Sequence, residues 1–130
     1  MVNRILRPTG VWKSDQFAFS QGIKSDGINL VFVSGQVGID PSGKIVGDDV
    51  GAQIKQSFEN MKMVLQEAGA SFSNVAKLNA YMTNIEDLPK YSEIMTTYFP
   101  DGFPAQTVVE VKKLALPEFK VEIEATAVIS

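Results

Sequence analysis

The segment from Asp49 to Ala68 carries the pattern that most constrains what this chain can fold into. Its apolar residues recur every three or four positions, which is typical of one face of an amphipathic helix. These residues are Val50, Ile54, Phe58, Met61, Leu65 and Ala68. Asp48 or Asp49 can cap the start of this helix, and Gly69 stands where a left-handed residue commonly ends one. The sequence therefore predicts a helix over 49–68.

Strand-like patterns flank this helix. Residues 29–36 (NLVFVSGQ) are an apolar run of β-branched and aromatic types, which predicts a strand buried on both faces. Other strands are predicted over 16–24, 75–83, 105–111 and 119–129. In the last strand, one face carries Val121, Ile123, Ala125 and Ala127, and Glu122 and Glu124 begin the other face.

A second helix is predicted after the strand at 75–83. Asn84 and Asp87, three positions apart, resemble a capping pair for it. The helix stops at the segment Pro100-Asp101-Gly102. One side of this helix carries Leu88, Tyr91, Met95 and Tyr98.

The order of strands, helix, strand, helix and strands predicts an α+β fold. Two helices cannot cover both faces of such a sheet, so the simplest packing puts both on one face. The other face must then meet solvent or other subunits. The apolar residues at 30–33 argue against solvent, which predicts a homo-oligomer.

Composition narrows the chemistry. The 130 residues suggest one domain, 1–130. The chain has no cysteine and no histidine, so acid–base chemistry must use Asp, Glu, Lys, Tyr or water. A net charge of −3 gives no general case for nucleic-acid binding. We see neither a membrane-spanning apolar segment nor a signal peptide, so the expected location is cytoplasmic.

Several motifs occur in an order that points to a family. They are Phe19-Ser20-Gln21-Gly22, Ser34-Gly35-Gln36, Gln53 with Asn60-Met61, Phe103-Pro104-Ala105 and Val121-Glu122-Ile123-Glu124-Ala125. From about residue 16 to residue 129, this ordered set resembles the reactive intermediate deaminase (Rid) family, also called endoribonuclease L-PSP.

The resemblance implies a fold like that of bacterial chorismate mutase, with a six-stranded mixed sheet. It also implies a homotrimer with a central barrel and a ligand cleft between each pair of neighbouring subunits. Well-studied members hydrolyse enamines and imines, such as 2-aminoacrylate, to a 2-keto acid and ammonia. The family chemistry needs no metal and no organic cofactor.

The family clamps the substrate carboxylate with an arginine after Phe-Pro-Ala, and this chain has Gln106 there. Phe19 replaces a tyrosine and Ser92 an asparagine, whereas Glu122 matches the glutamate that positions water. Without the arginine, carboxylate binding should weaken by about tenfold to several hundredfold. The resemblance therefore predicts catalytic roles for Glu122 and Gln106, and ligand contacts for Phe19, Ser34, Gly35, Gln36, Ser92 and Gln106.

Each of these residues also has a purely structural interpretation. Gln106 could be a strand residue facing water, and Phe19 a core residue. Ser34-Gly35 could be a strand end that needs small residues. Ser92 could be a solvated helix residue, and Glu122 could lie on a wet face of its strand.

The sequence is compatible with three functions. The first is a hydrolase of enamine- or imine-type compounds with altered specificity, and the second is a small-molecule binding module that has lost the deaminase chemistry. The third is a ribonuclease or translation inhibitor. The absence of histidine and of a basic stripe argues against the third. The sequence leaves the first two open.

Overall fold

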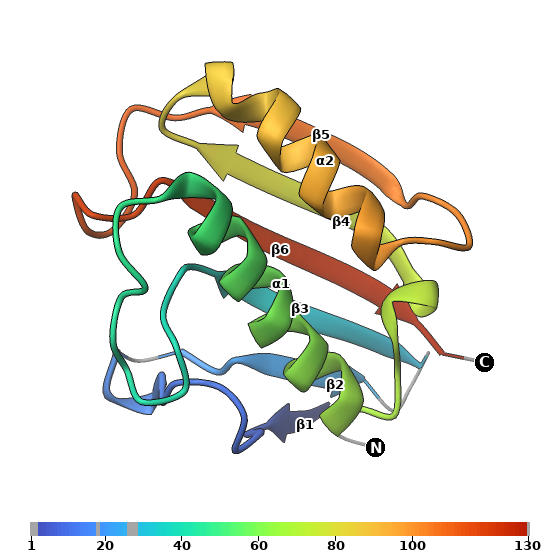
Figure 1. Ribbon diagram of the computed structural model, residues 1–130. Coiled ribbons are helices and arrows are strands. Elements are labelled where there is room, and N and C mark those ends of the chain that lie inside the picture. Colours follow the sequence, from blue (N-terminus) through green and yellow to red (C-terminus); the bar gives the residue numbers. More distant parts are fainter. Residues whose placement is uncertain (1–2, 18, 26–28, 130) are drawn as a thin grey trace.

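The protein is a six-stranded mixed sheet with two helices on one face. The computed structural model describes residues 3–17, 19–25 and 29–129. Its elements are β1 (Asn3–Leu6), β2 (Gly22–Ser25), β3 (Leu30–Gln36), α1 (Val50–Glu67), β4 (Val75–Met82), α2 (Leu88–Tyr98), β5 (Ala105–Glu110) and β6 (Val121–Val128). The sheet order is β1-β2-β3-β6-β4-β5, and β4 and β5 run parallel. Both helices cross the same face (Figure 1), which confirms the expected α+β arrangement.

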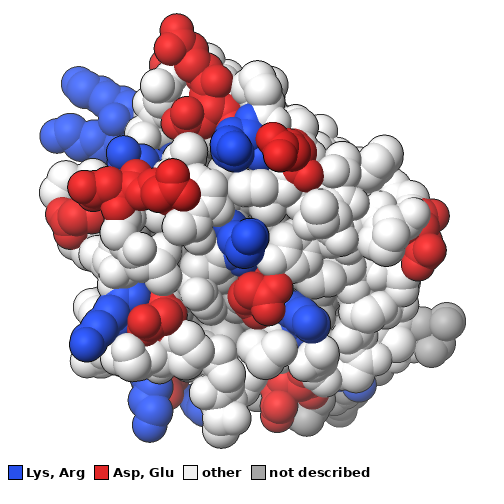
Figure 2. Space-filling model, viewed as in Figure 1, with Lys and Arg blue, Asp and Glu red and all other residues white. Residues whose placement is uncertain are grey.

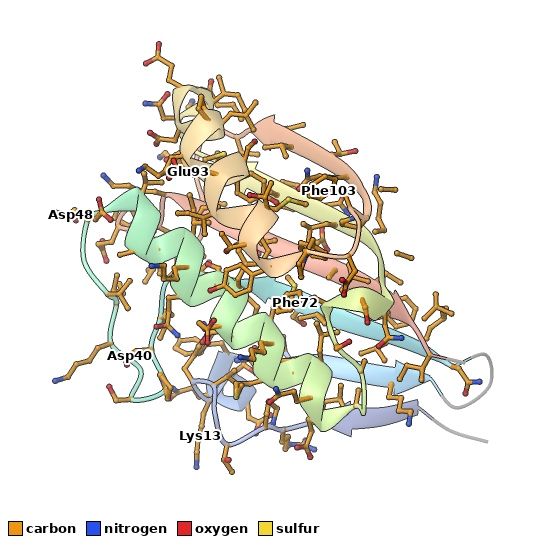
Figure 3. All side chains as sticks on the ribbon, turned by 45° about the vertical axis from the view of Figure 1, so that its right-hand side comes forward. Lys13, Asp40, Asp48, Phe72, Glu93 and Phe103 are labelled. Atoms are coloured by element: carbon orange, nitrogen blue, oxygen red, sulfur yellow. The ribbon has the colours of Figure 1, made fainter. Side chains whose placement is uncertain are left out.

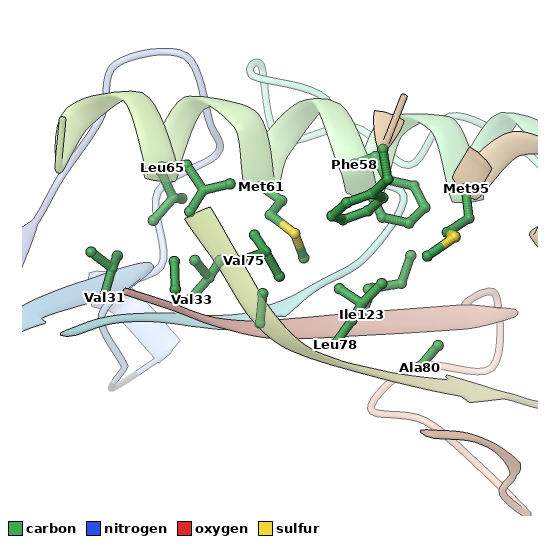
Figure 4. Packing of buried hydrophobic residues seen from close by; sticks show 14 of the residues in the cluster. Val31, Val33, Phe58, Met61, Leu65, Val75, Leu78, Ala80, Met95 and Ile123 are labelled. Carbon is green, nitrogen blue, oxygen red and sulfur yellow. The ribbon is translucent and has the colours of Figure 1, made fainter. Parts of the chain in front are cut away.

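Helix α1 confirms the prediction for 49–68. The Asp49 carboxylate accepts a hydrogen bond from the Ala52 N–H at 2.8 Å, and Gly69 follows the helix with a φ of 79°. The apolar face of α1, with Phe58, Met61 and Leu65, points down onto the sheet (Figure 4). No helix in the described part of the chain is long and apolar enough to span a bilayer.

Helix α2 packs beside α1 through a cluster of aromatic rings. The Phe58 and Tyr98 rings stack with centroids 4.8 Å apart. Phe72 lies between α1 and the end of α2, with its centroid 5.3 Å from those of Tyr98 and Phe99 (Figure 3). Tyr91 is fully buried below α2. The predicted apolar side of this helix is therefore confirmed.

The start of α2 differs from the prediction. Asn84 caps a short 3-10 helix at Ile85–Asp87 by accepting a hydrogen bond from the Glu86 N–H at 3.0 Å. Asp87 makes no side-chain capping bond to α2, which begins at Leu88. Asn84 and Asp87 therefore do not act together as a capping pair for α2.

The predicted strand over 16–24 is wrong in its first half. Asp15–Phe17 forms a 3-10 helix, residue 18 lies outside the described residues, and only Gly22–Ser25 is a strand. The Phe17 and Phe19 rings both contact the Trp12 ring edge-on, with centroids 5.9 and 5.6 Å away. These contacts curl the segment around Trp12, so it is not extended there.

Strand β3 is buried on one face in the single chain, and the expected burial of its other face stays a prediction that depends on other subunits. Val31 and Val33 are buried under α1, whereas Phe32, on the opposite face, is 45% exposed. The same outer face exposes further large apolar side chains, those of Ile5, Val109 and Val128. These exposed apolar side chains are consistent with the predicted homo-oligomer, which itself stays a prediction.

Two buried amides on α1 tie the loops to the helix. The Gln53 side-chain amide donates to the carbonyl oxygens of Gly47 (2.7 Å) and Glu118 (2.9 Å), and it accepts from the Lys120 N–H at 2.9 Å. About two turns further along the helix, Asn60 donates to the carbonyl oxygens of residues 37 and 39. Both side chains are completely buried, so each bond replaces one that water would otherwise make.

Truncating Gln53 tests this role. Gln53→Ala removes three part-buried hydrogen bonds, and each contributes about 0.5–1.5 kcal/mol, so we expect a loss of about 2–4 kcal/mol. Urea unfolding followed by circular dichroism measures it. Gln66→Ala is the matched control, because Gln66 lies on the exposed face of the same helix. Equal midpoints for the two variants would contradict the assignment.

Candidate functional site

A hollow of about 440 Å³ opens at the end of the sheet where β3 ends and β6 begins. It is lined by aromatic and aliphatic side chains and by one carboxylate: Trp12, Phe17, Phe19, Gly35, Val37, Ile39, Ala115, Leu116, Phe119 and Glu122. The loops of this end lie at the left of Figure 1. The loops that carry Lys13 and Asp40 lie beside one another here (Figure 3). Three predicted site residues, Phe19, Gly35 and Glu122, therefore share one hollow.

Gly35 is a glycine because the Glu122 carboxylate occupies the space of its side chain. A Cβ built on Gly35 would lie 1.9 Å from Glu122 Oε2 and 2.7 Å from its Cδ. Such contacts are impossible, so any larger residue at 35 must displace the carboxylate. The strand pairing across β3 and β6 shifts register between Val33 and Gln36, around the same point. The backbone of β3 thus sets where the carboxylate of β6 lies.

Burial is the main cause of a raised pKa at Glu122, and the nearby Glu124 carboxylate adds to it. Glu124 lies two residues along β6 on the same outer face and accepts a hydrogen bond from the Tyr81 hydroxyl. This hydrogen bond is the largest cause of a raised pKa at Tyr81. Glu122 therefore holds a proton more readily than an ordinary glutamate, which is typical of a group that exchanges protons in a reaction.

Ser34 and Gln36 support the wall of the hollow from behind. The Ser34 hydroxyl donates to the Ser20 carbonyl at 2.5 Å. The buried Gln36 amide donates to Gln21 Oε1 at 2.6 Å, and Gln21 in turn donates to the Trp12 carbonyl at 2.8 Å. Neither Ser34 nor Gln36 lines the hollow. In the single chain they fix the segment that carries Phe19.

Gln106 lies elsewhere. It pairs with Leu78 on β4, whose side chain faces the helices, whereas Glu122 pairs with Tyr81 on the outer face. The two side chains therefore leave opposite faces of the sheet within one chain. The Tyr91 hydroxyl donates to Gln106 Oε1 at 2.6 Å.

Ser92 is exposed on α2 and does not line the hollow. Of the predicted site residues, four do not line the hollow in the single chain: Ser34, Gln36, Ser92 and Gln106.

Sequence reasoning assigned no role to residues 1–15, yet Trp12 is central to the site. Trp12 is 7% exposed and forms a second apolar cluster with Val37, Ile39 and Phe119. It contacts both Phe17 and Phe19. The only signal in the sequence was that this is the single tryptophan of the chain, since its partners come from three separate segments.

The hollow offers one proton-exchanging group in apolar surroundings. None of the described residues that line it carries a positive charge. Within the described residues, no three His, Cys, Asp or Glu side chains gather as metal ligands would. The chemistry that these residues can supply is proton transfer at Glu122 beside an apolar ligand.

Known proteins resemble this chain along most of its length. The sequence model of the endoribonuclease L-PSP family matches residues 14–129. A RutC family protein of Pyrococcus abyssi is 41% identical over 110 residues, covering 84% of this chain and 84% of that protein. The human 2-iminobutanoate/2-iminopropanoate deaminase is 38% identical over 112 residues, covering 85% and 79%. RidA of the Antarctic bacterium Psychrobacter sp. has a crystal structure that superposes with a TM-score of 0.89 at 29% identity, covering 97% and 99%.

The contact between Gly35 and Glu122 can be tested by one methyl group. Gly35→Ala should push the Glu122 carboxylate out toward solvent, because the added Cβ takes its place. The pKa of Glu122 should then fall toward that of an exposed glutamate, measured by carboxyl-carbon NMR titration. Gly51→Ala is the control, since the nearest atom to its Cβ is Asp49 Oδ2 at 3.2 Å. An unchanged Glu122 pKa in Gly35→Ala would contradict the contact.

The raised pKa of Glu122 also predicts a pH dependence of stability. The folded state binds this proton more tightly than the unfolded chain, so this contribution to stability is complete below the ordinary glutamate pKa. It is lost as pH rises through the raised value. A glutamine at position 122 cannot ionise, so the Glu122→Gln protein should have a higher melting temperature than the wild type at pH 7. This difference in melting temperature should shrink toward pH 4.

The control for this pH series is Glu86→Gln, the same change at an exposed position. The difference in melting temperature between Glu86→Gln and the wild type should be the same at pH 7 and pH 4. A melting temperature of Glu122→Gln that stays below the wild type at both pH values would contradict the expected penalty for the buried charge.

Proposed function

This chain belongs to the endoribonuclease L-PSP, or Rid, family, and we propose that it hydrolyses enamine- or imine-type compounds to a carbonyl product and ammonia. The observation that carries the proposal is the Glu122 carboxylate, half-buried against Gly35 at the wall of an apolar hollow. A small metabolite would bind there, with its carbon–nitrogen double bond beside the carboxylate.

The role of Glu122 follows from its environment. Ionised Glu122 accepts a proton from a water molecule as the water oxygen attacks the imine carbon. The protonated acid then returns the proton to the nitrogen, which leaves as ammonia. A pKa raised by burial suits a group that must both take and give a proton.

The specificity would differ from that of the family members with an arginine. The human relative is named for deamination of 2-iminobutanoate and 2-iminopropanoate, both of which carry a carboxylate. Here Gln106 stands at the arginine's position, carries no charge and accepts the Tyr91 hydroxyl bond. A neutral amide binds a carboxylate more weakly than a guanidinium fork does.

We further propose a barrel-cored homotrimer of chorismate-mutase-like subunits, each a single domain over 1–130, in the cytoplasm. The exposed apolar residues of the outer sheet face, among them Phe32 and Val128, support burial against other copies. In such an assembly, Gln106 of one subunit could approach the hollow of its neighbour. Ser92 and the backbone near Ser34 and Gln36 would complete the same inter-subunit cleft.

A binding module without catalysis is the second candidate function. The observation that favours it is the lack of a positive charge among the described residues of the hollow. Without a cation to orient a small imino acid, the hollow could still bind an apolar ligand. A ligand of this kind would raise the melting temperature without being consumed.

A ribonuclease or translation inhibitor has no such observation in its favour. On the helix face, acidic and basic side chains are interspersed and no continuous basic surface forms (Figure 2). Affinity for RNA depends on clustered positive charge.

Imine hydrolysis tests the proposal. A dehydratase generates 2-aminoacrylate in place, and keto-acid release is followed with wild type, Glu122→Gln and Gln106→Arg. We expect Glu122→Gln to lower any acceleration by about 100-fold, since a general base contributes about 10²–10⁴-fold. Gln106→Arg should raise the acceleration about tenfold or more, because it supplies the charged clamp.

Glu86→Gln is the matched control and should behave like the wild type. Because Gln106→Arg removes the acceptor of the Tyr91 hydroxyl, its melting temperature is measured alongside. The proposal is wrong if neither the wild type nor Gln106→Arg accelerates hydrolysis of any imine in a broad panel. If ligands still raise the melting temperature in that case, the protein is a binding module.

A further inference from the structure

We propose that the hollow selects imines that lack a carboxylate and carry an aromatic or branched apolar substituent. The substrate would then be the imine of an amine and not the imine of an amino acid. This inference rests on the proposed hydrolysis and names its substrate class. It follows from the charge, the walls and the shape of the hollow.

The charge of the hollow disfavours a carboxylate. Glu122 is the one charged side chain among the described lining residues, and Glu124 stands behind it on the same strand face. Lys113 lines an adjoining hollow with both glutamates, but in the described part of the chain it forms no ion pair with either. A carboxylate placed beside Glu122 would be repelled, whereas a protonated imine would be attracted.

The walls suit a ring or a branched chain. Phe17, Phe19 and Leu116 are 61%, 37% and 44% exposed, which is a large apolar area to leave open at one place. Phe17 and Phe19 meet Trp12 edge-on, so their rings stand as walls around it. An apolar substituent between these walls would cover them from water.

The size of the hollow agrees with such a ligand. Its volume of about 440 Å³ lies within the range of about 300–1,000 Å³ that is usual for small-molecule sites. The carboxylate stands at one wall, against Gly35, and the aromatic residues form the others. A ligand can thus place its ring among Trp12, Phe17 and Phe19 and its C=N group beside Glu122. A positively charged nitrogen close to these rings would also gain from cation–π attraction.

The reaction balances without any other reactant. The oxygen of water bonds to the carbon of the protonated imine, Glu122 takes one water proton, and the π electrons of the C=N bond move to nitrogen. Glu122 returns that proton to nitrogen, the C–N bond breaks with its electron pair leaving on ammonia, and Glu122 takes the hydroxyl proton as the carbonyl forms. The net change is protonated imine plus water to aldehyde or ketone plus ammonia, with one proton passed from Glu122 to solvent. A two-electron oxidation of a primary amine would supply this substrate.

A matched set of imines tests the inference. A flavin amine oxidase releases the imine of 2-phenylethylamine, and an amino-acid oxidase releases the imines of phenylalanine and alanine. The first two share a phenyl ring and differ in the carboxylate. Semicarbazide traps the imine that remains, so hydrolysis by the protein is read as a fall in semicarbazone formation against an oxidase-only blank.

We expect the wild type to accelerate hydrolysis of the phenylethylamine imine about tenfold or more over that of the phenylalanine imine. Phe19→Ala should reduce the acceleration for the phenylethylamine imine about tenfold, because it removes one wall. The matched control is Ile85→Ala, an exposed apolar truncation that lines none of the hollows described, and it should match the wild type. Gln106→Arg should shift the preference toward the phenylalanine imine.

The outcomes separate this inference from the function on which it rests. Equal or faster hydrolysis of the phenylalanine imine overturns the substrate class and leaves imine hydrolysis standing. Preference for the alanine imine overturns it as well, since that substrate has a carboxylate and no ring. No acceleration of any of the three imines overturns both proposals together.

Discussion

The loops around the hollow depend on the buried amides of Gln53 and Asn60, which hold them to α1. A helix that packs on a sheet needs only apolar contacts, but the loops beyond the sheet carry polar backbone groups that must find partners. The Gln53 side chain hydrogen-bonds backbone groups of the loop before β6 and of the loop before α1. The Asn60 side chain hydrogen-bonds backbone carbonyls of the loop after β3. The hollow exists because these loops are held open at fixed positions along α1.

The periodic elements could be predicted because their patterns are local. In α1 and β6, each apolar residue reports directly which face is buried, and both elements match the sequence pattern. The segment at 16–24 could not be predicted in the same way, because the ring of Trp12 bends it. What covers Phe32 could not be predicted for a different reason. An apolar strand residue gives the same sequence pattern whether its own chain or another chain covers it.

The candidate site was predictable only in part. Ordered motifs identified Glu122, Gly35 and Phe19, which share the hollow. These residues could be identified because each lies in a short motif within or beside a strand. The same reasoning grouped Gln106 with Glu122, yet strand register sends their side chains to opposite faces. Trp12 and Phe17, which stand beside Phe19 in the aromatic wall, belong to no motif, since only the folded chain brings them to the hollow.

The contact of Gly35 with Glu122 has a consequence for how such a site can change over generations. A side chain at position 35 and the present placement of the Glu122 carboxylate exclude each other, so the two positions form an epistatic pair. A lineage that abandons the carboxylate frees the space at 35 and can then accept a larger residue there. A carboxylate regained later would be pushed toward solvent until that residue is removed, so the first loss of Glu122 would act as a ratchet against regaining the chemistry.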